Sequence, residues 1–557
     1  MTQLNAARSR KCQHAREPLC RSQACADTLT PMQRGWLPHL FGVLATAFLI
    51  LFLVYPLGVI LLRGFSGWDA LRDLLANPYY RQRLWFTTWQ ALLSTALTVI
   101  LALPCALLFA RYDFRGKRLL KSAFTIPFVM PTVVAAIGFL ALIGPRGLLN
   151  VDLRGTLAII LLAHVFYNYA VVVRIVGSYL EGLGPRAYEA AKMLGSSPLN
   201  TLRRVTLPLA MPAIIAAATL VFIFCFTSFG VILILAPEPQ FATLEVEIYR
   251  LTSRLLQLDS AGILVLIQLV VVTLFTLLYT RTQARLAVTL GSRGNPLPRP
   301  TGLRRVFLGL NILIAVALIL SPLLALGYST FWPAESAGPS LRNFEHLAAA
   351  QRTIGFAGAG QAIINSLRFA ALSTLCALLV GFAFAYAVVR GGWRLLDSAS
   401  LLPLATSAVT LGFGYLLAFP ALRTSIWGLT LAHTLIAFPF VARSILPALR
   451  GLPTNLLAAA QTLGAHPLRI LGRVELPLLV PSFITAASFA FAISMGEFGA
   501  TLTLQPAGLA TIPVAIFDRL GRPGAANYGA ALALSFILMV ITGLVMMLLE
   551  TFGEGEF

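Results

Sequence analysis

The stretch Glu189-Ala190-Ala191-Lys192-Met193-Leu194-Gly195 continues to Leu207-Pro208 and Pro212 and lies between two long apolar segments. A second copy reads Ala458-Ala459-Ala460-Gln461-Thr462-Leu463-Gly464 and continues to Leu476-Pro477 and Pro481. The offsets 458 − 189, 464 − 195, 477 − 208 and 481 − 212 all equal 269, which indicates an internal duplication. A polar helical loop that occurs twice in one chain predicts a two-fold partner that grips both copies.

The duplication extends beyond this loop. At the same offset of 269, the first half carries His164, Arg174, Phe229 and Gly230, and the second half carries His433, Arg443, Phe498 and Gly499. The segment Ala242-Thr243-Leu244 recurs as Ala510-Thr511-Ile512. The chain therefore consists of two copies of one unit.

Composition places both units in a membrane. The chain has 557 residues, of which 58% are hydrophobic and 11% are charged, and its mean hydropathy is +0.82. Soluble proteins have roughly a quarter of their residues charged, whereas a helix that spans a bilayer needs about 20 apolar residues. We expect twelve such spans, near residues 37–62, 84–110, 119–143, 156–180, 209–236, 260–280, 306–327, 362–389, 395–419, 424–449, 480–503 and 528–549. Six spans per half is an even number, so the sequence predicts an all-α polytopic membrane protein made of two parallel repeats.

The basic residues set the orientation of these spans. The net charge of +21 includes clusters at residues 111–121 and 281–305, in alternate loops, which is the positive-inside pattern. No basic groove or motif accompanies this charge, so we exclude nucleic-acid binding. An N-terminus in the cytoplasm then makes both copies of the duplicated loop cytoplasmic. The predicted organisation is a disordered basic tail at 1–36, a first repeat at 37–280, a cytoplasmic linker at 281–305, a second repeat at 306–550 and a C-terminal tail at 551–557.

The local sequence of the loop predicts two short helices at the membrane face. Glu189 lies near the positive end of the first helix, and Gly195 suits the left-handed residue that ends it. A second short helix then follows. Pro208 and Pro212 are expected to break the helical regularity where the chain enters the bilayer again.

The order Glu-Ala-Ala, three residues, Gly, then Leu-Pro and a proline four residues later resembles the signature loop of binding-protein-dependent ABC importer permeases. The first copy matches that pattern in full, and the likeness covers nearly everything after residue 36. A single chain with two fused halves resembles the ferric-iron and thiamine permeases, whose relatives carry molybdate or sulfate. The resemblance implies the MetI-like permease fold and a multi-pass protein of the bacterial inner membrane with both termini in the cytoplasm.

The resemblance also implies the partners. Each loop docks a short coupling helix in a cytoplasmic ABC ATPase dimer, and an extracytoplasmic solute-binding protein delivers the solute. The only Gly-Lys pair, Gly116-Lys117, is followed by Arg118, so the chain has no phosphate-binding loop and the ATP is bound by the partner. We expect no metal, no cofactor and no enzymatic activity in this chain. In the family the acidic residue of the motif pairs with a base of the ATPase, which Glu189 can do and Ala458 cannot.

Polar residues within the spans are the other candidates for function. Glu497 lies about 15 residues into its span, roughly 22 Å deep at 1.5 Å per residue, and its counterpart is Ser228. Such groups face a cavity or a partner, so we predict a pathway role for Glu497, Ser228, His164, His433 and Asn168, with buried hydrogen bonds between helices as the alternative. Outside the membrane, segments 243–258 and 510–520 are either a landing surface for the binding protein or interfacial helices.

Three classes of function are compatible with a polytopic chain. An ABC permease requires duplicated docking loops and a separate ATPase, and the sequence provides the loops. A secondary transporter would need coupling charges at mid-membrane, which are scarce, and an embedded enzyme would need converging catalytic groups, which are dispersed. The sequence therefore favours an ABC permease for thiamine or ferric iron, with molybdate, sulfate or polyamine as alternative solutes.

Overall fold

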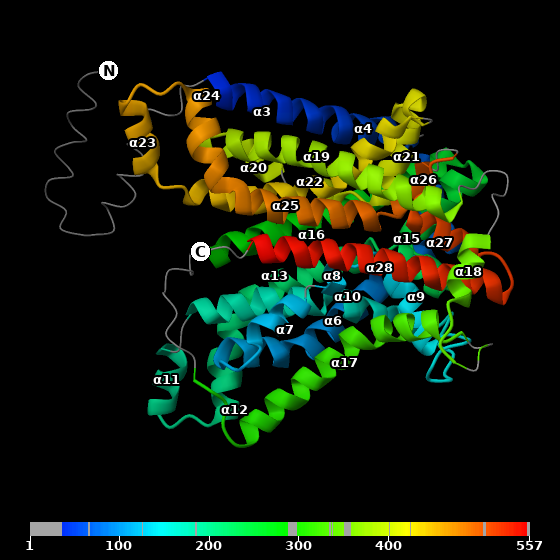
Figure 1. Ribbon diagram of the computed structural model, residues 1–557, viewed down its shortest axis with the longest axis horizontal. Helices are drawn as coiled ribbons and strands as arrows, with labels where there is room; N and C mark the ends of the chain where they lie inside the picture. The colour runs from blue at the N-terminus through cyan, green and yellow to red at the C-terminus, as the bar shows by residue number, and fades with distance from the viewer. Residues whose placement is uncertain are drawn as a thin grey trace, which may run out of the picture.

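The computed structural model describes residues 36–64, 67–124, 126–183, 186–287, 298–333, 336, 338–349, 358–399, 402–423, 425–504 and 508–553. Every regular element in these residues is helical, which confirms the predicted all-α class. Figure 1 shows the long helices running side by side along one axis, with short helices projecting at one end. Residues 1–35 of the tail and residues 288–297 of the linker lie outside the described residues.

Ten helical segments of the described chain are long and apolar enough to span a membrane. In the first repeat they are Trp36–Arg63, α6 (Pro78–Arg111), α10 (Leu157–Leu183), Pro198–Phe226 and α16 (Leu258–Ala287), whose apolar span is Leu258–Thr282. In the second repeat they are α17 (Leu303–Phe331), α19 (Ala359–Gly391), α22 (Ile426–Gly451), Pro467–Gly496 and α28 (Ala525–Gly553), counted as Ala525–Met547. Both repeats thus contribute five long helices.

The third predicted span of each repeat is broken into short pieces. In the first repeat it consists of α7 (Lys117–Ala123), α8 (Ile126–Val129) and α9 (Thr132–Ile143), and in the second of α20 (Arg394–Ala399), a short 3-10 turn and α21 (Ala408–Ala418). A helix of twelve residues rises only about 18 Å, less than the bilayer core of about 30 Å. Nearly all side chains of α9 and α21 are buried, and irregular backbone at membrane depth is tolerated where protein covers it. Ten long helices and two broken ones account for the twelve spans.

The first helix of each repeat packs on the opposite repeat. The first span consists of α3 (Trp36–Leu49), a π-helical turn at Ile50–Val54 and α4 (Tyr55–Gly64), and it lies against α19, α21 and α16. Its counterpart α17 lies against α9, α28 and α6. Figure 1 shows this exchange, with blue α3 beside α19 along one edge and green α17 along the other. The two sequence repeats are therefore interlocked, not separate bodies.

Two glycines make this exchange possible at equivalent places. A Cβ added to Gly138 of α9 would lie 2.6 Å from the carbonyl oxygen of Pro322 in α17. A Cβ added to Gly414 of α21 would lie 3.0 Å from Cβ of Pro56 in α4. Each broken third span therefore receives the proline of the other repeat's first helix at a position where only hydrogen fits.

The segments predicted to be external surfaces are in part packed into the core. In α15 (Leu244–Arg250), Leu244, Glu245, Glu247 and Ile248 are all at most 1% exposed. In α27 (Ile512–Leu520), residues 512 to 516 are buried. Glu247 accepts a hydrogen bond from the hydroxyl of Tyr79 at 2.8 Å, so this part of the first segment faces the protein. Residues 253–257 are exposed, and a landing surface there stays a prediction.

Candidate functional site

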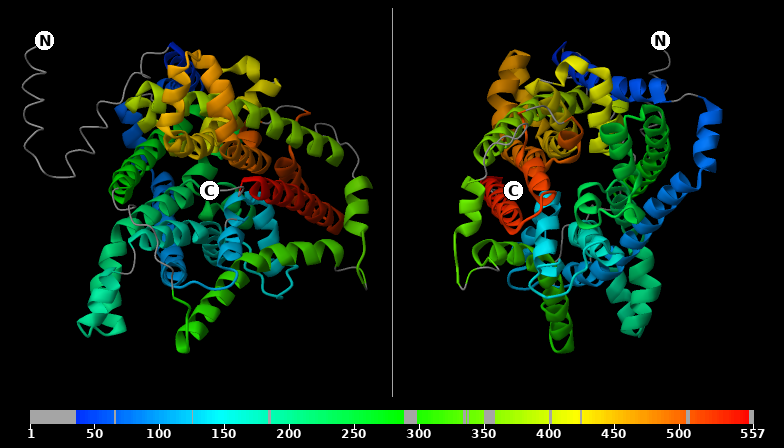
Figure 2. Two further views of the ribbon diagram at one scale, coloured as in Figure 1. Left: turned by 60° about the vertical axis from the view of Figure 1, so that its left-hand side comes forward. Right: turned by 90° about the vertical axis from the view of Figure 1, so that its right-hand side faces the viewer.

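The duplicated motif forms two helical loops that project from the same end of the helix bundle. The first contains α11 (Arg186–Met193) and α12 (Pro198–Thr201), and the second contains α23 (Thr454–Thr462) and α24 (Pro467–Ile470). Figure 1 shows both loops at the left-hand end, and the left view of Figure 2 separates the teal first loop from the orange second loop. The described chain also begins, at α3, and ends, with α28, toward this end of the bundle (Figure 1).

The two predicted glycines end the first helix of each loop in the same way. Gly195 and Gly464 have φ of +73° and +72°, in the left-handed region that favours glycine. The amide of Gly195 donates to the carbonyl of Lys192 at 3.0 Å, and that of Ser196 donates to Ala191 at 3.1 Å. In the second loop Gly464 donates to Gln461 at 2.9 Å and Ala465 to Ala460 at 3.1 Å. This pair of bonds is the Schellman motif, so the turn geometry predicted from the sequence is confirmed twice.

The irregularity expected at Pro208 takes the form of a π-helical turn and does not end the helix, and none occurs at Pro212. The chain runs as one helix from Pro198 to Phe226 and from Pro467 to Gly496. Pro208 and Pro477 lie in the first turn of α13 (Leu207–Phe226) and α25 (Leu476–Gly496), and each is preceded by a π-helical turn, at Leu202–Thr206 and Leu471–Glu475. Because a π turn moves each hydrogen bond to the residue five positions back, it accommodates the missing amide of proline without ending the helix. Pro212 and Pro481 lie inside these helices.

Both loops expose leucines at equivalent positions. Leu194 and Leu463 are each 87% exposed, and Leu199 and Leu468, again 269 residues apart, are 55% and 48% exposed. Ala190 and Ala459 are exposed beside them, whereas Ala191 is buried. A pair of apolar side chains presented to solvent at the same place in both repeats is the kind of patch that marks a protein-binding surface. The sequence signal, equal spacing, was available, but only the structure shows that these leucines point outward.

The two loops differ in how they are fixed to the long helices. In the first loop Arg111, at the end of α6, donates to the Thr206 hydroxyl and lies 4.7 Å from the ring of Tyr188. In the second loop Arg390, at the end of α19, binds Glu475 through Nε at 2.9 Å and Nη2 at 2.8 Å from Oε1. Thr206 and Glu475 are 269 residues apart and so occupy the same position in the repeat. The partner of the arginine at this position is a neutral threonine in the first repeat and an acidic glutamate in the second. These anchors were not predicted from the sequence. An arginine at the end of a span is explained equally well by the excess of basic residues on the cytoplasmic side, which gives no indication of a specific partner. Glu189 and Ala458 are both exposed.

The polar residues predicted inside the spans form two buried networks. In the first repeat, Nδ1 of His164 is hydrogen-bonded to the hydroxyl of Ser94 at 2.8 Å, and its Nε2 is hydrogen-bonded to the hydroxyl of Ser228 at 3.0 Å. Asn168 donates to the carbonyl of His164 at 2.9 Å. His164 is 2% exposed and Asn168 3%, so this network links α6, α10 and the end of α13.

The second network is repeat-related and contains an acid. His433 contacts Ser494 through Nδ1 at 2.8 Å, and its Nε2 lies 3.0 Å from the Thr501 hydroxyl and 3.2 Å from Oε2 of Glu497. Glu497 accepts hydrogen bonds from the amides of Ala500 and Thr501, at 2.8 and 2.9 Å, and so caps the start of α26 (Gly499–Leu504). Glu497 is 6% exposed, and this geometry favours the predicted alternative of hydrogen bonds between helices. A pathway role for these residues stays a prediction.

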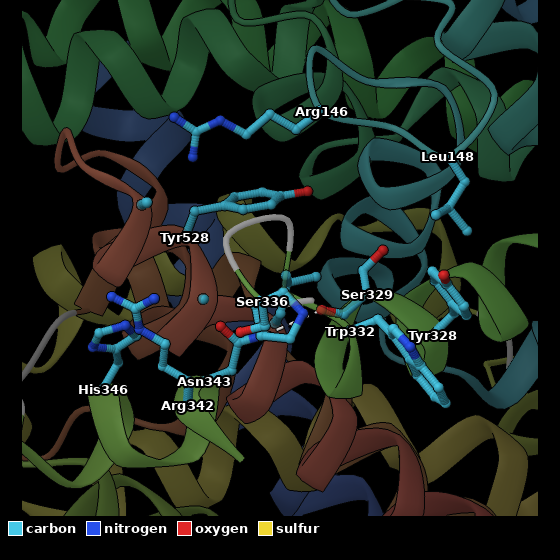
Figure 3. A pocket seen from close by; sticks show the side chains of 14 residues that line it. Arg146, Leu148, Tyr328, Ser329, Trp332, Ser336, Arg342, Asn343, His346 and Tyr528 are labelled. Atoms are coloured by element: carbon cyan, nitrogen blue, oxygen red, sulfur yellow. Dashed lines mark hydrogen bonds between the residues drawn. The ribbon is translucent and has the colours of Figure 1, made fainter. Parts of the chain in front are cut away.

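A cavity of about 510 Å³ lies at the end of the bundle opposite the loops. The end of α17, α18 (Arg342–Ala349), α28 and the segment after α9 surround it. Figure 3 shows Arg146, Arg342 and His346 toward one side of it and the rings of Tyr328 and Trp332 toward the other. These two rings stack 5.1 Å apart, and mixed aromatic and basic side chains are typical of the membrane–water interface. None of the residues predicted from the sequence lines this cavity.

Comparison with protein families gives a match over residues 102–288 to a model described as "Binding-protein-dependent transport system inner membrane component". This range contains the whole first loop and the spans on either side of it. It begins within α6, and so it leaves out the first helix that packs on the other repeat.

Comparison with individual proteins gives matches over nearly the whole chain. The chain is 28% identical to the thiamine transport system permease protein ThiP of Escherichia coli, over 92% of this chain and 97% of that protein. It is 24% identical to the protein of the same name from Haemophilus influenzae, over 92% and 96%. It is 26% identical to a probable ABC transporter permease protein, y4fN, of Sinorhizobium fredii, over 90% and 93%.

Proposed function

The chain belongs to the binding-protein-dependent ABC importer permeases, and on that premise we propose that it carries thiamine across the membrane. The observation that carries this proposal is the likeness to thiamine permeases over 92% of this chain, well beyond the range of the family model. None of the three relatives described above is named for iron, so the second solute that the sequence left open has no comparable support.

The coupling role of the two loops is part of the proposal. Permeases of this family act with a separate ATPase and with a binding protein on the other side of the membrane. Two Schellman-capped helices with equivalent exposed leucines suit an ATPase dimer that offers the same cleft twice. Glu189, Ala190 and Gly195 would contact one cleft, with buried Ala191 packed behind them, and the segment 458–464 would contact the other. The loop-bearing end, with both described chain ends near it, would then face the cytoplasm.

The arrangement of the anchors supports force transmission through the loops. Each π-helical turn leads directly into a long helix, and each is tied to the end of the second span by Arg111 or Arg390. A loop held both by continuous helix and by a side-chain anchor moves together with the spans. Closure of the ATPase dimer would therefore displace α13 and α25 instead of bending the loops.

Uptake in vesicles tests the solute. We expect proteoliposomes that contain the chain, its ATPase and its binding protein to accumulate radiolabelled thiamine when ATP is supplied. Unlabelled thiamine in excess should abolish the signal, whereas ferric citrate, molybdate and sulfate should leave it unchanged. A matched preparation with a hydrolysis-deficient ATPase serves as the control.

A different pattern of competition would overturn the assignment. If labelled iron accumulates and excess thiamine does not affect it, the chain is a permease for another solute. The assignment of the chain to the family would stand in that case, because it rests on the whole-length likeness and the duplicated loops.

A further inference from the structure

Four aromatic rings form a continuous ladder where the two repeats meet. The rings of Phe229 and Phe498 stack with their centroids 5.6 Å apart and their planes 28° from parallel. Phe229 also contacts Tyr249 edge to face at 5.4 Å, and Phe498 contacts Phe517 in the same way at 5.4 Å. The order of the rings is therefore Tyr249, Phe229, Phe498 and Phe517.

The ladder obeys the internal symmetry of the chain. Phe229 and Phe498 are 269 residues apart, and Tyr249 and Phe517 are 268 apart, the offset that also relates Thr243 to Thr511. Each repeat thus contributes one ring at the interruption of its fifth span, Phe229 or Phe498, and one ring from a later short helix. The later rings are Tyr249 in α15 and Phe517 in α27. In the central stack a residue of one repeat therefore contacts its own counterpart in the other.

The ladder lies where both fifth spans are interrupted. α13 ends at Phe226 and α14 (Gly230–Leu235) begins four residues later, and α25 ends at Gly496 before α26 begins at Gly499. Interrupted helices within a membrane occur where they are covered by protein or line a path, and in transporters they mark the solute site at the interface of the repeats. Figure 1 places α15, α26 and α27 toward the end opposite the coupling loops.

The rings leave little space between the two repeats. Phe229, Phe498 and Tyr249 are 7%, 3% and 6% exposed. A Cβ added to Gly230 would lie 3.2 Å from Cδ1 of Phe498, and one added to Gly496 would lie 3.0 Å from Cα of Pro131 in the first repeat. In this conformation a solute would have to separate Phe229 from Phe498 in order to pass between the repeats.

The buried polar networks hold the residues next to these rings. Ser228 precedes Phe229 and contacts His164 at 3.0 Å, and Glu497 precedes Phe498 and caps α26. His164 and Glu497 are thereby positioning residues for the rings. This gives them a role in the pathway without direct contact with the solute.

We propose that Tyr249, Phe229, Phe498 and Phe517 form the closed constriction of the translocation pathway, and that their ring faces contact a planar aromatic cation as it passes. The first part needs only that the chain is a permease, whereas the second rests on the proposed function, because the thiazolium ring of thiamine is a flat aromatic cation. Faces of aromatic rings attract cations and stack on flat rings, and the faces of Phe229 and Phe498 cover each other until the repeats part.

The seal is tested by passive leak through proteoliposomes that contain the permease without ATP. We expect Phe229→Ala and Phe498→Ala to raise the leak of a small neutral sugar well above wild type. Phe222→Ala is the matched control, because Phe222 is equally buried and stacks on Phe275 at 4.0 Å, but within one repeat. It should lose thermal stability without leaking. If the two ladder variants leak no more than Phe222→Ala, the rings are ordinary core packing and the constriction is refuted.

The contact with the solute is tested by Phe498→Leu, which keeps an apolar side chain of similar size but removes the ring. We expect vesicles with this variant to stay sealed and to transport thiamine with kcat/KM reduced roughly 2- to 30-fold, the range expected for loss of one cation–π contact. Phe498→Tyr should restore transport. Wild-type kinetics in the leucine variant would overturn the contact. If wild-type vesicles transport no thiamine at all, the proposed function fails, and the leak experiment still decides the constriction.

Discussion

The ion pair between Arg390 and Glu475 should make the second coupling loop far more sensitive to mutation than the first. Glu475 is fully buried and Arg390 is 9% exposed, and two guanidinium nitrogens lie within 2.9 Å of one carboxylate oxygen. Removal of one partner leaves an uncompensated buried charge, which costs about 3–5 kcal/mol. Glu475→Ala should therefore raise the equilibrium constant for unfolding by a factor of about 10² to 10⁴.

The first repeat supplies the matched control. Thr206 occupies the position of Glu475 and accepts a hydrogen bond from Arg111, which is partly exposed and also stacks on Tyr188. Thr206→Ala removes one hydrogen bond and strands no buried charge, so it should cost only about 1 kcal/mol. The difference between the two variants isolates the buried charge from the general effect of a shortened side chain.

The assay is reversible unfolding of the purified permease in mixed micelles, titrated with a denaturing detergent. The double variant Arg390→Met/Glu475→Leu removes both charges, and it should recover most of the stability that Glu475→Ala loses, because apolar residues of similar volume often replace a buried pair without cost. If Glu475→Ala is as stable as Thr206→Ala, the pair is not effectively buried and the anchoring role assigned to it is wrong.

Three further outcomes follow from the loops and the second polar network. Gly195→Ala and Gly464→Ala should each cost about 1–2 kcal/mol locally, because φ near +70° is strained for alanine although the added Cβ meets no atom, and hydrogen exchange of the loop amides should rise in both. Glu189→Ala should release the ATPase during purification, more so at high salt, whereas Ala458→Glu should retain it at least as well as wild type; equal retention in all three proteins would exclude a charge pair at Glu189. Glu497→Gln should weaken the cap of α26 and its contact with His433, lowering the melting temperature and transport together; a transport defect at unchanged stability would place Glu497 in direct contact with the solute.

The long spans and the two duplicated helical loops could be predicted from the sequence because both depend on local information. Hydropathy marks a span, and the spacing of Gly195 and Gly464 marks a helix end twice over. The predicted left-handed glycines and the all-α class are confirmed. The duplication strengthens these predictions, because two different sequences show the same local pattern at equivalent positions.

The exchange of first helices could not be predicted, because it depends on contacts between segments far apart in the chain. Gly138 and Pro322 read as an ordinary small residue and an ordinary kink until the fold brings them together. The form of the irregularity expected near Pro208 could not be predicted for a related reason. Proline removes one hydrogen bond, and a π-helical turn absorbs that loss in a way that residue type alone does not indicate.

The aromatic ladder could be predicted from the sequence only in part. The repeat pointed to Phe229 and Phe498, but in a chain with 36 phenylalanines an apolar ring is no signal by itself. What distinguishes these two is their position at the interruption of both fifth spans, together with the stacking of one on the other. Only coordinates supply that information.

We propose that a separate ATPase drives transport through the two coupling loops. Uptake of labelled thiamine into sealed proteoliposomes, measured with the ATPase present and then with it removed by a salt wash, tests this claim most directly. We expect uptake to require both the ATPase and ATP, and to return when the ATPase is added back. Equal uptake before and after removal of the ATPase would contradict this coupling of transport to the ATPase.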